Sequence, residues 1–244
     1  MPKLLPASFL AVLALSLAAC TNVSWGDGEA VEGSGTSSSR TVEVSGIRSV
    51  SLATPGTLVI TQGAAPLVIE GDDNLIDRVQ AEVRNGTLQI GTERGVSLRP
   101  RSDLRYTVGV DRLEGIEVAG SGRIEARGAQ AETVTVEIAG SGGADVADIR
   151  AEAVRIRMAG SGGVTVAGQT TRLSVEVAGS GDVEASDLAA DQAEVEIAGS
   201  GDVTLRAEKT LDAQIMGSGD VRYAGSPEVS RQVMGSGSVT RADG

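Results

Sequence analysis

The sequence contains no histidine and a single cysteine, Cys20. Without histidine the chain has no Ser-His-Asp or Cys-His catalytic machinery, no imidazole proton shuttle and no histidine-ligated zinc. One cysteine can form neither an internal disulfide nor a thiolate metal site. These absences exclude most nucleophilic hydrolases and most transition-metal sites, and we expect the protein to need no cofactor.

Aromatic residues are almost as scarce, at 2% of the chain, and basic residues are outnumbered. Lys and Arg total 21 against 33 Asp and Glu, which gives a net charge of −12. A chain this acidic gains nothing from phosphate contacts, so we expect no nucleic-acid partner. Its charge would not draw it to anionic lipid either, so any link to a membrane must be covalent or apolar.

The first twenty residues supply such a link. Lys3 precedes an apolar run, 4–19, that is too short to span a bilayer comfortably. The run ends in Leu17-Ala-Ala-Cys20, which resembles a bacterial lipobox. We therefore predict that residues 1–19 are a lipoprotein signal peptide and that Cys20 is the lipid-attachment residue, through which the protein meets the membrane. The alternative is an ordinary cleaved signal peptide with a coincidental cysteine.

Thr21 follows the cysteine, and by resemblance to the Gram-negative sorting rule this residue favours the outer membrane. Residues 21–40 are rich in Gly, Ser and acidic residues and show no apolar period. We predict that 20–40, the acylated cysteine and the segment after it, form a flexible tether.

A tetrapeptide recurs through the second half of the chain. Ala-Gly-Ser-Gly begins at positions 119, 139, 159, 178 and 198, and Met-Gly-Ser-Gly begins at 216 and 234. The spacings of 20, 20, 19, 20, 18 and 18 residues indicate a solenoid or another repeat array. Apolar residues alternate on both sides of each copy, as in Val134, Val136 and Ile138, and this period of two predicts strands with one buried face.

Stacked coils explain this pattern better than the alternative, an antiparallel array of hairpins, because equivalent positions keep their residue types from unit to unit. The composition agrees, since a narrow coil has room for Val, Ile and Ala but little room for rings. We expect the serines of the seven tetrapeptides to stack as a hydroxyl ladder that serves the corners. Reading them as a row of nucleophiles fails because the pattern supplies no base.

Two outward columns are acidic. The first contains Glu117, Glu137, Arg157, Glu176, Glu196, Gln214 and Gln232, and the second contains Asp182, Asp202 and Asp220. Like charges stacked about 4.8 Å apart repel unless water, salt or a cation relieves them. We interpret the columns as a solvated acidic face and keep weak Ca²⁺ binding as the alternative. An ice-binding solenoid would instead need flat threonine arrays.

Residues 41–118 lack the tetrapeptide but contain short β runs such as 57–60 and 66–70. Asn85-Gly86 predicts a hairpin turn, and 72–76 could form a single capped helical turn. The final unit, 226–244, carries Arg231 and Arg241 at positions that are apolar in earlier units, together with Pro227. We predict that it is a cap, against the alternative that the repeat simply decays.

The order of these segments resembles a known family. The stretches VEVSGIRSVSL, GTLVITQG, LVIEGDDNLIDRVQAEVRNGTLQI and LEGIEVAGSGRIEA are similar to the putative auto-transporter adhesin, head GIN domain family, over about 41–240, although no literal Gly-Ile-Asn occurs. The resemblance implies a bacterial envelope protein folded as an all-β, right-handed parallel β-helix with rungs of about 18–20 residues. It offers no catalytic residue.

We therefore expect residues 41–244 to be one solenoid domain, with irregular N-terminal rungs at 41–118 and Gly-Ser-Gly repeats at 119–244. Its expected role is that of a non-catalytic, lipid-anchored adhesin or scaffold of the cell envelope with a protein or polysaccharide ligand. The alternative is a polysaccharide lyase or hydrolase, since glycosidic cleavage needs only two carboxylates. Sugar sites usually stack rings on aromatic side chains, and only Tyr106 and Tyr223 lie in the predicted domain.

Overall fold

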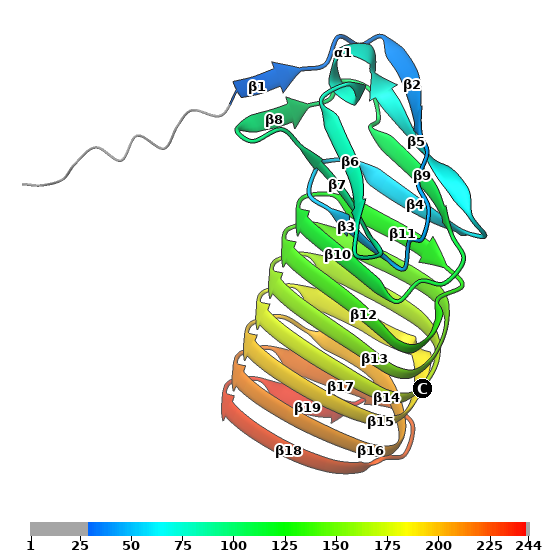
Figure 1. The fold of residues 1–244 in the computed structure, drawn as a ribbon. Helices are drawn as coiled ribbons and strands as arrows, with labels where there is room; N and C mark the ends of the chain where they lie inside the picture. Colours follow the sequence, from blue (N-terminus) through cyan, green and yellow to red (C-terminus); the bar gives the residue numbers. More distant parts are fainter. Residues whose placement is uncertain (1–28, 243–244) are drawn as a thin grey trace, which may run out of the picture.

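The computed structural model describes residues 29–242. Within this range the chain forms nineteen β-strands and one helical turn. Seventeen strands join in one continuous sheet that winds into a solenoid, and the other two form a small separate sheet. The stacked coils are visible in Figure 1, and the predicted all-β solenoid is confirmed. No helix in 29–242 has the length and apolarity needed to cross a membrane.

The repeats form the regular part of the stack, and every strand pair in it is parallel. This pairing excludes the antiparallel array of hairpins. Its strands are β10 (Gly115–Gly120), β11 (Arg123–Arg127), β12 (Gln130–Gly140), β13 (Gly143–Gly160), β14 (Gly163–Gly179), β15 (Asp182–Gly199), β16 (Val203–Gly217), β17 (Asp220–Ala224), β18 (Glu228–Gly235) and β19 (Ser238–Arg241).

Each coil turns sharply at its Gly-Ser-Gly corner. We call the strand segments that precede these corners the A face, which runs from β10 through β12 to β18. The segments that follow them form the B face, which runs from β11 through the first residues of β13 to β19. The pairing register joins Gly140, Gly160, Gly179 and Gly199 in one line. The tetrapeptides are therefore stacked directly on one another.

The spacing of the tetrapeptides varies by two residues, and a second corner absorbs the difference. The register shifts between Val146 and Ile149 and between Thr165 and Gly168, both after the B face. A further shift lies between Ala185 and Ala189. Insertions are thus confined to the return of each coil, while the Gly-Ser-Gly corner and the A face keep an unbroken register.

Glycine is required at the first corner for two physical reasons. Gly199 has φ = 143°, a conformation that side-chain-bearing residues rarely adopt. A Cβ on Gly199 would also overlap the carbonyl oxygen of Gly179 in the coil above, and a Cβ on Gly201 would overlap that of Gly181. The two glycines of the tetrapeptide are therefore a packing requirement of the stack.

The core is a set of aliphatic columns inside the coil. Residues that alternate along each strand are buried, as in Val134, Val136 and Ile138, and the register places Val154, Ile156 and Met158 directly beneath them. Burial of apolar side chains without a gap between coils is what stabilises each two-strand unit, which could not hide its apolar face alone. The predicted alternation of buried and exposed residues is confirmed.

The N-terminal region consists of β1 (Glu29–Glu32), β2 (Ser37–Val42), β3 (Ser49–Leu52), β4 (Thr57–Gln62), β5 (Ala65–Asp72), α1 (Asp73–Ile76), β6 (Val79–Arg84), β7 (Thr87–Thr92), β8 (Val96–Arg99) and β9 (Arg105–Val110). Its coils are not stacked in chain order. β3 and β4 lie between β7 and β9 on one side and β10 and β11 on the other. The residues of β3 and β4, which form the second coil of the stack, therefore precede in the sequence those of β7 and β9, which form the first.

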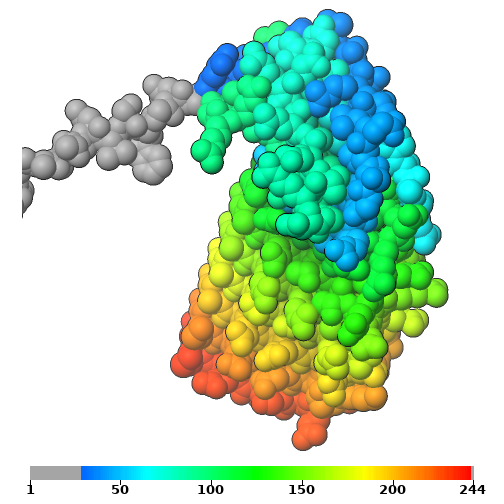
Figure 2. All heavy atoms as spheres, viewed as in Figure 1, coloured from blue at the N-terminus to red at the C-terminus, as the bar shows by residue number. Residues whose placement is uncertain are grey.

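Strands β2, β5 and β6 pair in antiparallel fashion with this top coil or with each other. They cover the N-terminal end of the stack, where the blue and cyan atoms lie in Figure 2. The predicted hairpin is present, with β6 and β7 joined by Asn85 and Gly86, which both have positive φ. The helical turn is present too, although the Asp72 side chain does not cap it.

The predicted tether is wrong over its C-terminal half. Residues 29–32 form β1, which pairs with β8, and residues 37–42 form β2, which pairs with β5. Ser34, between them, is held by Asn74 and Asp73. The Gly- and Ser-rich composition gives no local sign of these strands. They form by pairing with β8 and β5, which lie far away in the sequence. The predicted signal peptide and Cys20 lie outside the described residues.

The last described coil keeps the register but changes its interior. Arg231 lies beneath Ala213 and Arg241 beneath Tyr223, as the sequence alignment of the units predicted. The Arg231 guanidinium donates to the carbonyl oxygen of Val239 (3.2 Å), and that of Arg241 donates to the Ser226 hydroxyl. These two arginines place polar groups where earlier coils have core residues, as expected of a cap.

Candidate binding surface

The A face presents two neighbouring columns of side chains to solvent. The first, which we call the central column, is the predicted column that begins at Glu117 and ends at Gln232, and the strand register places all seven of its residues in line. Beside it, at the corner, runs a column of exposed residues with short side chains: Ala139, Ala159, Ala178 and Ala198. This column ends in two exposed methionines, Met216 and Met234.

Arg157 holds the central column together. Its guanidinium lies 3.1 Å from the Glu137 carboxylate and 3.3 Å from that of Glu176, one coil above and one below. These hydrogen bonds and the two negative charges raise the pKa of Arg157 above its usual value. Repulsion within the column is therefore relieved at its centre by an arginine.

A shallow groove of about 480 Å³ follows these two columns along the stack. Its floor is made of the small corner residues, with Ala159 and Ala178 in the middle. The charged column forms one side, and Met216 lies at the C-terminal end. The sequence indicated the charged column but not the groove, which arises only because alanine repeats in register beside longer side chains.

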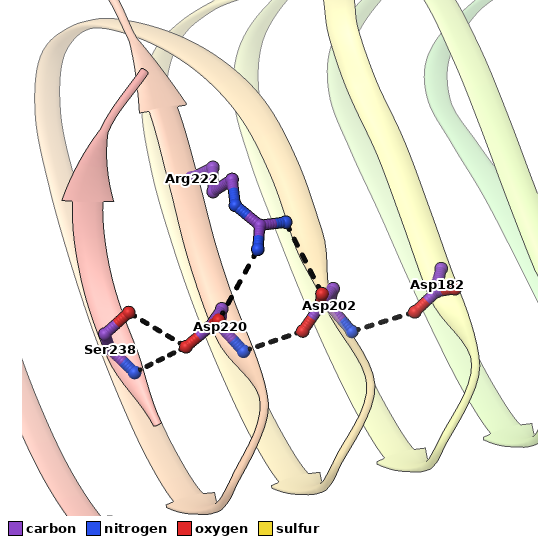
Figure 3. A network of polar contacts seen from close by, with 5 residues as sticks. All are labelled: Asp182, Asp202, Asp220, Arg222 and Ser238. Carbon is purple, nitrogen blue, oxygen red and sulfur yellow. Dashed lines mark hydrogen bonds and ion pairs between the residues drawn. The ribbon is translucent and has the colours of Figure 1, made fainter. Parts of the chain in front are cut away.

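The second acidic column, on the B face, has a different chemistry from the one the sequence suggested. The Asp182 carboxylate accepts the Asp202 amide, and the Asp202 carboxylate accepts the Asp220 amide, at 3.0 and 2.9 Å. The Asp220 carboxylate accepts the amide and hydroxyl of Ser238. Figure 3 shows this ladder, with Arg222 bridging Asp202 and Asp220. Each aspartate thus joins its coil to the next.

This ladder bears directly on the calcium alternative. Within residues 29–242, no group of three or more Asp, Glu, Cys or His side chains is arranged to hold a metal ion. One oxygen of each aspartate already accepts a backbone amide, and Arg222 supplies positive charge. The structure therefore accounts for the stacked aspartates without a cation.

The corner serines also act differently from the prediction. Their side chains lie exposed at the corner, and the hydrogen bonds run through their backbone amides. Ser141 donates to the Gly120 carbonyl, Ser161 to Gly140 and Ser200 to Gly179, at 2.8–2.9 Å. The corner is held by a backbone ladder rather than by a hydroxyl ladder.

One carboxylate missed by the sequence analysis is fully buried. Asp72, at the end of β5, accepts the backbone amides of Gly35, Arg101 and Ser102 and the Ser102 hydroxyl. Burial alone would raise the pKa of Asp72, but these hydrogen bonds outweigh it and lower the pKa to about 2. A perturbed carboxyl often marks an active site. Here its partners tie three distant segments together, so its role is structural.

We therefore expect Asp72 to make the stability of the N-terminal region depend on pH. The folded pKa of about 2 lies below the ordinary value of 3.8, so between these values the unfolded chain binds the proton more tightly. The stabilisation is fully present above about pH 4 and is lost as the pH falls to about 2. Asp72→Asn should lower the melting temperature at pH 7 and remove this pH dependence, as measured by circular dichroism between pH 2 and 7.

A matched control is Asp103→Asn, at an exposed position beside Ser102. It should leave the acid-dependent part of the melting curve unchanged. Identical acid unfolding profiles for Asp72→Asn and the unmodified chain would contradict this assignment.

The two tyrosines do not form a sugar-stacking platform. Tyr106 is wholly buried, its hydroxyl contacts Thr54 and Pro55, and burial raises its pKa to about 12. Tyr223 lies half-buried in the penultimate coil, beneath Leu205. The aromatic residues that a polysaccharide enzyme would use are therefore not gathered at one exposed site in the part of the chain described.

Comparison with known proteins agrees with this architecture. Residues 47–227 match the model of a family described as "Putative auto-transporter adhesin, head GIN domain". None of the curated proteins compared with the chain matches it.

Three solved structures share the fold. A "putative adhesin" from Bacteroides fragilis is 24% identical with a TM-score of 0.78, and the match covers 87% of this chain and 100% of that one. A "putative lipid binding protein" from Parabacteroides distasonis is 28% identical with a TM-score of 0.73, over 88% and 100%. A "putative adhesin" from the same species is 23% identical with a TM-score of 0.63, again over 88% and 100%.

Proposed function

The chain belongs to the putative auto-transporter adhesin, head GIN domain family, and we propose that it is a non-catalytic, lipid-anchored binding protein of the bacterial envelope that contacts its ligand through the A face. The observation that carries the proposal is the groove beside the charged column, which runs along the stack with small residues on its floor. An extended surface with regularly spaced charge suits a protein or polysaccharide ligand better than a small molecule.

The proposed anchor is acylated Cys20, in the outer membrane. Because β1 begins at Glu29, only residues 21–28 separate the anchor from the folded domain. Eight residues span at most about 28 Å, so the N-terminal end of the solenoid would lie close to the bilayer. The groove would then lead away from the membrane, with Met216 at its outer end.

The test begins with Cys20→Ser in an intact Gram-negative envelope. We expect the unmodified protein to partition into the detergent phase and the variant to move to the aqueous phase, because the acyl chains provide the membrane affinity. Equal partitioning of the two would contradict the anchor.

The same envelopes test the binding face. Ala178→Arg places a long side chain in the groove, whereas Ala64→Arg makes the same substitution at an exposed position outside it. We expect cross-linking to capture a defined ligand with the unmodified chain and Ala64→Arg, and at least tenfold less with Ala178→Arg. Equal capture by both variants would contradict the A face as the contact surface. Release of reducing or unsaturated sugar ends would contradict the non-catalytic role.

A further inference from the structure

A second hollow lies on the B face, away from the groove just described. It measures about 630 Å³ and extends across four stacked strands, β4, β11, β13 and β14. Three strand spacings give it a length of about 14 Å. It follows the second corner of the coils, where Gly128, Ala147 and Ala167 leave space because they have little or no side chain.

At the corner beside this hollow, one coil has positive φ at a residue other than glycine. Positive φ occurs at this corner in three consecutive coils, twice at glycine: Gly128 (81°) and Gly168 (139°), of which Gly168 is paired with Ile149 rather than with Asp148. The coil between them uses Asp148, at φ = 58°. Asp148 and Asn85 are the two residues other than glycine with positive φ in residues 29–242, and Asn85 belongs to the hairpin turn. Packing gives no reason for this carboxylate, whose side chain lines the hollow.

The other polar groups in the hollow are equally uncommitted. Arg127, Gln130 and Arg150 line it with Asp148 and Glu125. Within the described chain, none of these four charged side chains takes part in an ion pair, whereas Asp145, which also lines the hollow, is paired with Arg123 at 2.7 Å. The hollow therefore offers several hydrogen-bond donors and acceptors that no other part of the described protein uses.

The balance of charge indicates the class of ligand. Two guanidinium groups, Arg127 and Arg150, and two carboxylates, Glu125 and Asp148, line the hollow. The charge of its third carboxylate, Asp145, is paired with Arg123, so the hollow is close to neutral in a chain of net charge −12. The carboxylates would repel a phosphate group, and the guanidinium groups would repel a metal cation. A neutral ligand with many hydroxyl groups can form hydrogen bonds with donors and acceptors at once, and neither the carboxylates nor the guanidinium groups repel it.

We propose that this B-face hollow is a binding site for a short segment of neutral oligosaccharide, held by Arg127, Asp148 and Arg150. Its length suits a few sugar units, and its size falls within the range of protein ligand sites. Because no aromatic side chain lines it, binding relies on hydrogen bonds and is weak for a single site. The proposal is independent of the A-face groove.

The test is saturation-transfer NMR on the full-length purified protein with four probes: maltotetraose, cellotetraose, mannotetraose and tetra-N-acetylchitotetraose. We expect saturation transfer to at least one of them. Ala147→Trp should abolish it by filling the hollow, and Asp148→Gly should reduce it at least tenfold. Asp148→Gly should also melt at the same or a higher temperature, because it restores glycine at a positive-φ corner. Loss of binding in a more stable protein cannot be attributed to misfolding.

Ala178→Arg in the A-face groove is the control and should leave the signal unchanged. The proposal is overturned if none of the four sugars shows transfer, or if Ala147→Trp and Asp148→Gly bind as the unmodified chain does. Stronger binding of inorganic phosphate than of any of these sugars, with the same sensitivity to the two variants, would overturn the ligand class.

Discussion

Gly199→Ala is expected to destabilise the solenoid by about 2–5 kcal/mol, although it adds a single methyl group. Two causes combine at this corner. The backbone has φ = 143°, which alanine rarely adopts, and the new Cβ would overlap the carbonyl oxygen of Gly179. Relief would require the two coils to separate, which would break the ladder in which the Ser200 amide donates to Gly179. Urea unfolding followed by circular dichroism measures the effect.

Two other glycines in this part of the chain separate the two causes. Gly120→Ala also meets an unfavourable positive φ (102°) but has open space around the new Cβ, so it should cost about 1–2 kcal/mol. Gly163→Ala has open space and no positive φ, and it should change stability by less than about 0.5 kcal/mol. Equal effects at all three positions would show that the contact between stacked corners does not limit the fold.

Removal of residues 226–244 is expected to make the domain associate end to end. The deletion removes β18 and β19, which cover β16 and β17. It would uncover Leu211, Ile215 and Val221, which are now almost fully buried, beside a row of unpaired backbone groups. Apolar side chains on an open strand edge favour pairing with another chain. Light scattering of the truncated and full-length proteins, both with Cys20→Ser, measures the change in mass.

Two controls define what the last coil contributes. Deletion of 243–244 alone alters the terminus but leaves β18 and β19 in place, and it should remain monomeric. Arg231→Ala keeps the coil but removes the hydrogen bond to Val239, so it should lower the melting temperature without causing association. A truncated protein that stays monomeric and equally stable would show that 226–244 is not a cap.

Much of the repeat region was predictable because its determinants are local. A tetrapeptide at a pitch of 18–20 residues fixes where each coil turns, and alternation such as Val134, Val136 and Ile138 fixes which side chains point inward. Equal pitch places equal positions in register, so the column from Glu117 to Gln232 could be read from spacing alone. The same alignment placed Arg231 and Arg241 at core positions.

The binding surfaces were less predictable, because a hollow depends on differences between neighbouring coils. The sequence showed the acidic column but not the A-face groove, and it gave no sign of the B-face hollow around Asp148. The spacing of the aspartates at 182, 202 and 220 predicts a solvated acidic face, with calcium binding as the alternative, because spacing reveals charge but not hydrogen bonds. Their backbone partners belong to the next coil and become visible only once the coils are stacked.

By itself, then, the sequence determined the solenoid, its corners, its apolar interior and its polar last coil, since each follows from a period repeated along the chain. Only the tertiary structure decided the N-terminal end. There the second coil forms from residues that precede the first, and β1 and β2 arise in a segment with the composition of a linker. Asp72 joins Gly35 to Arg101 across 37 and 29 residues. Such contacts are set by the closing of the chain on itself, and no local pattern records them.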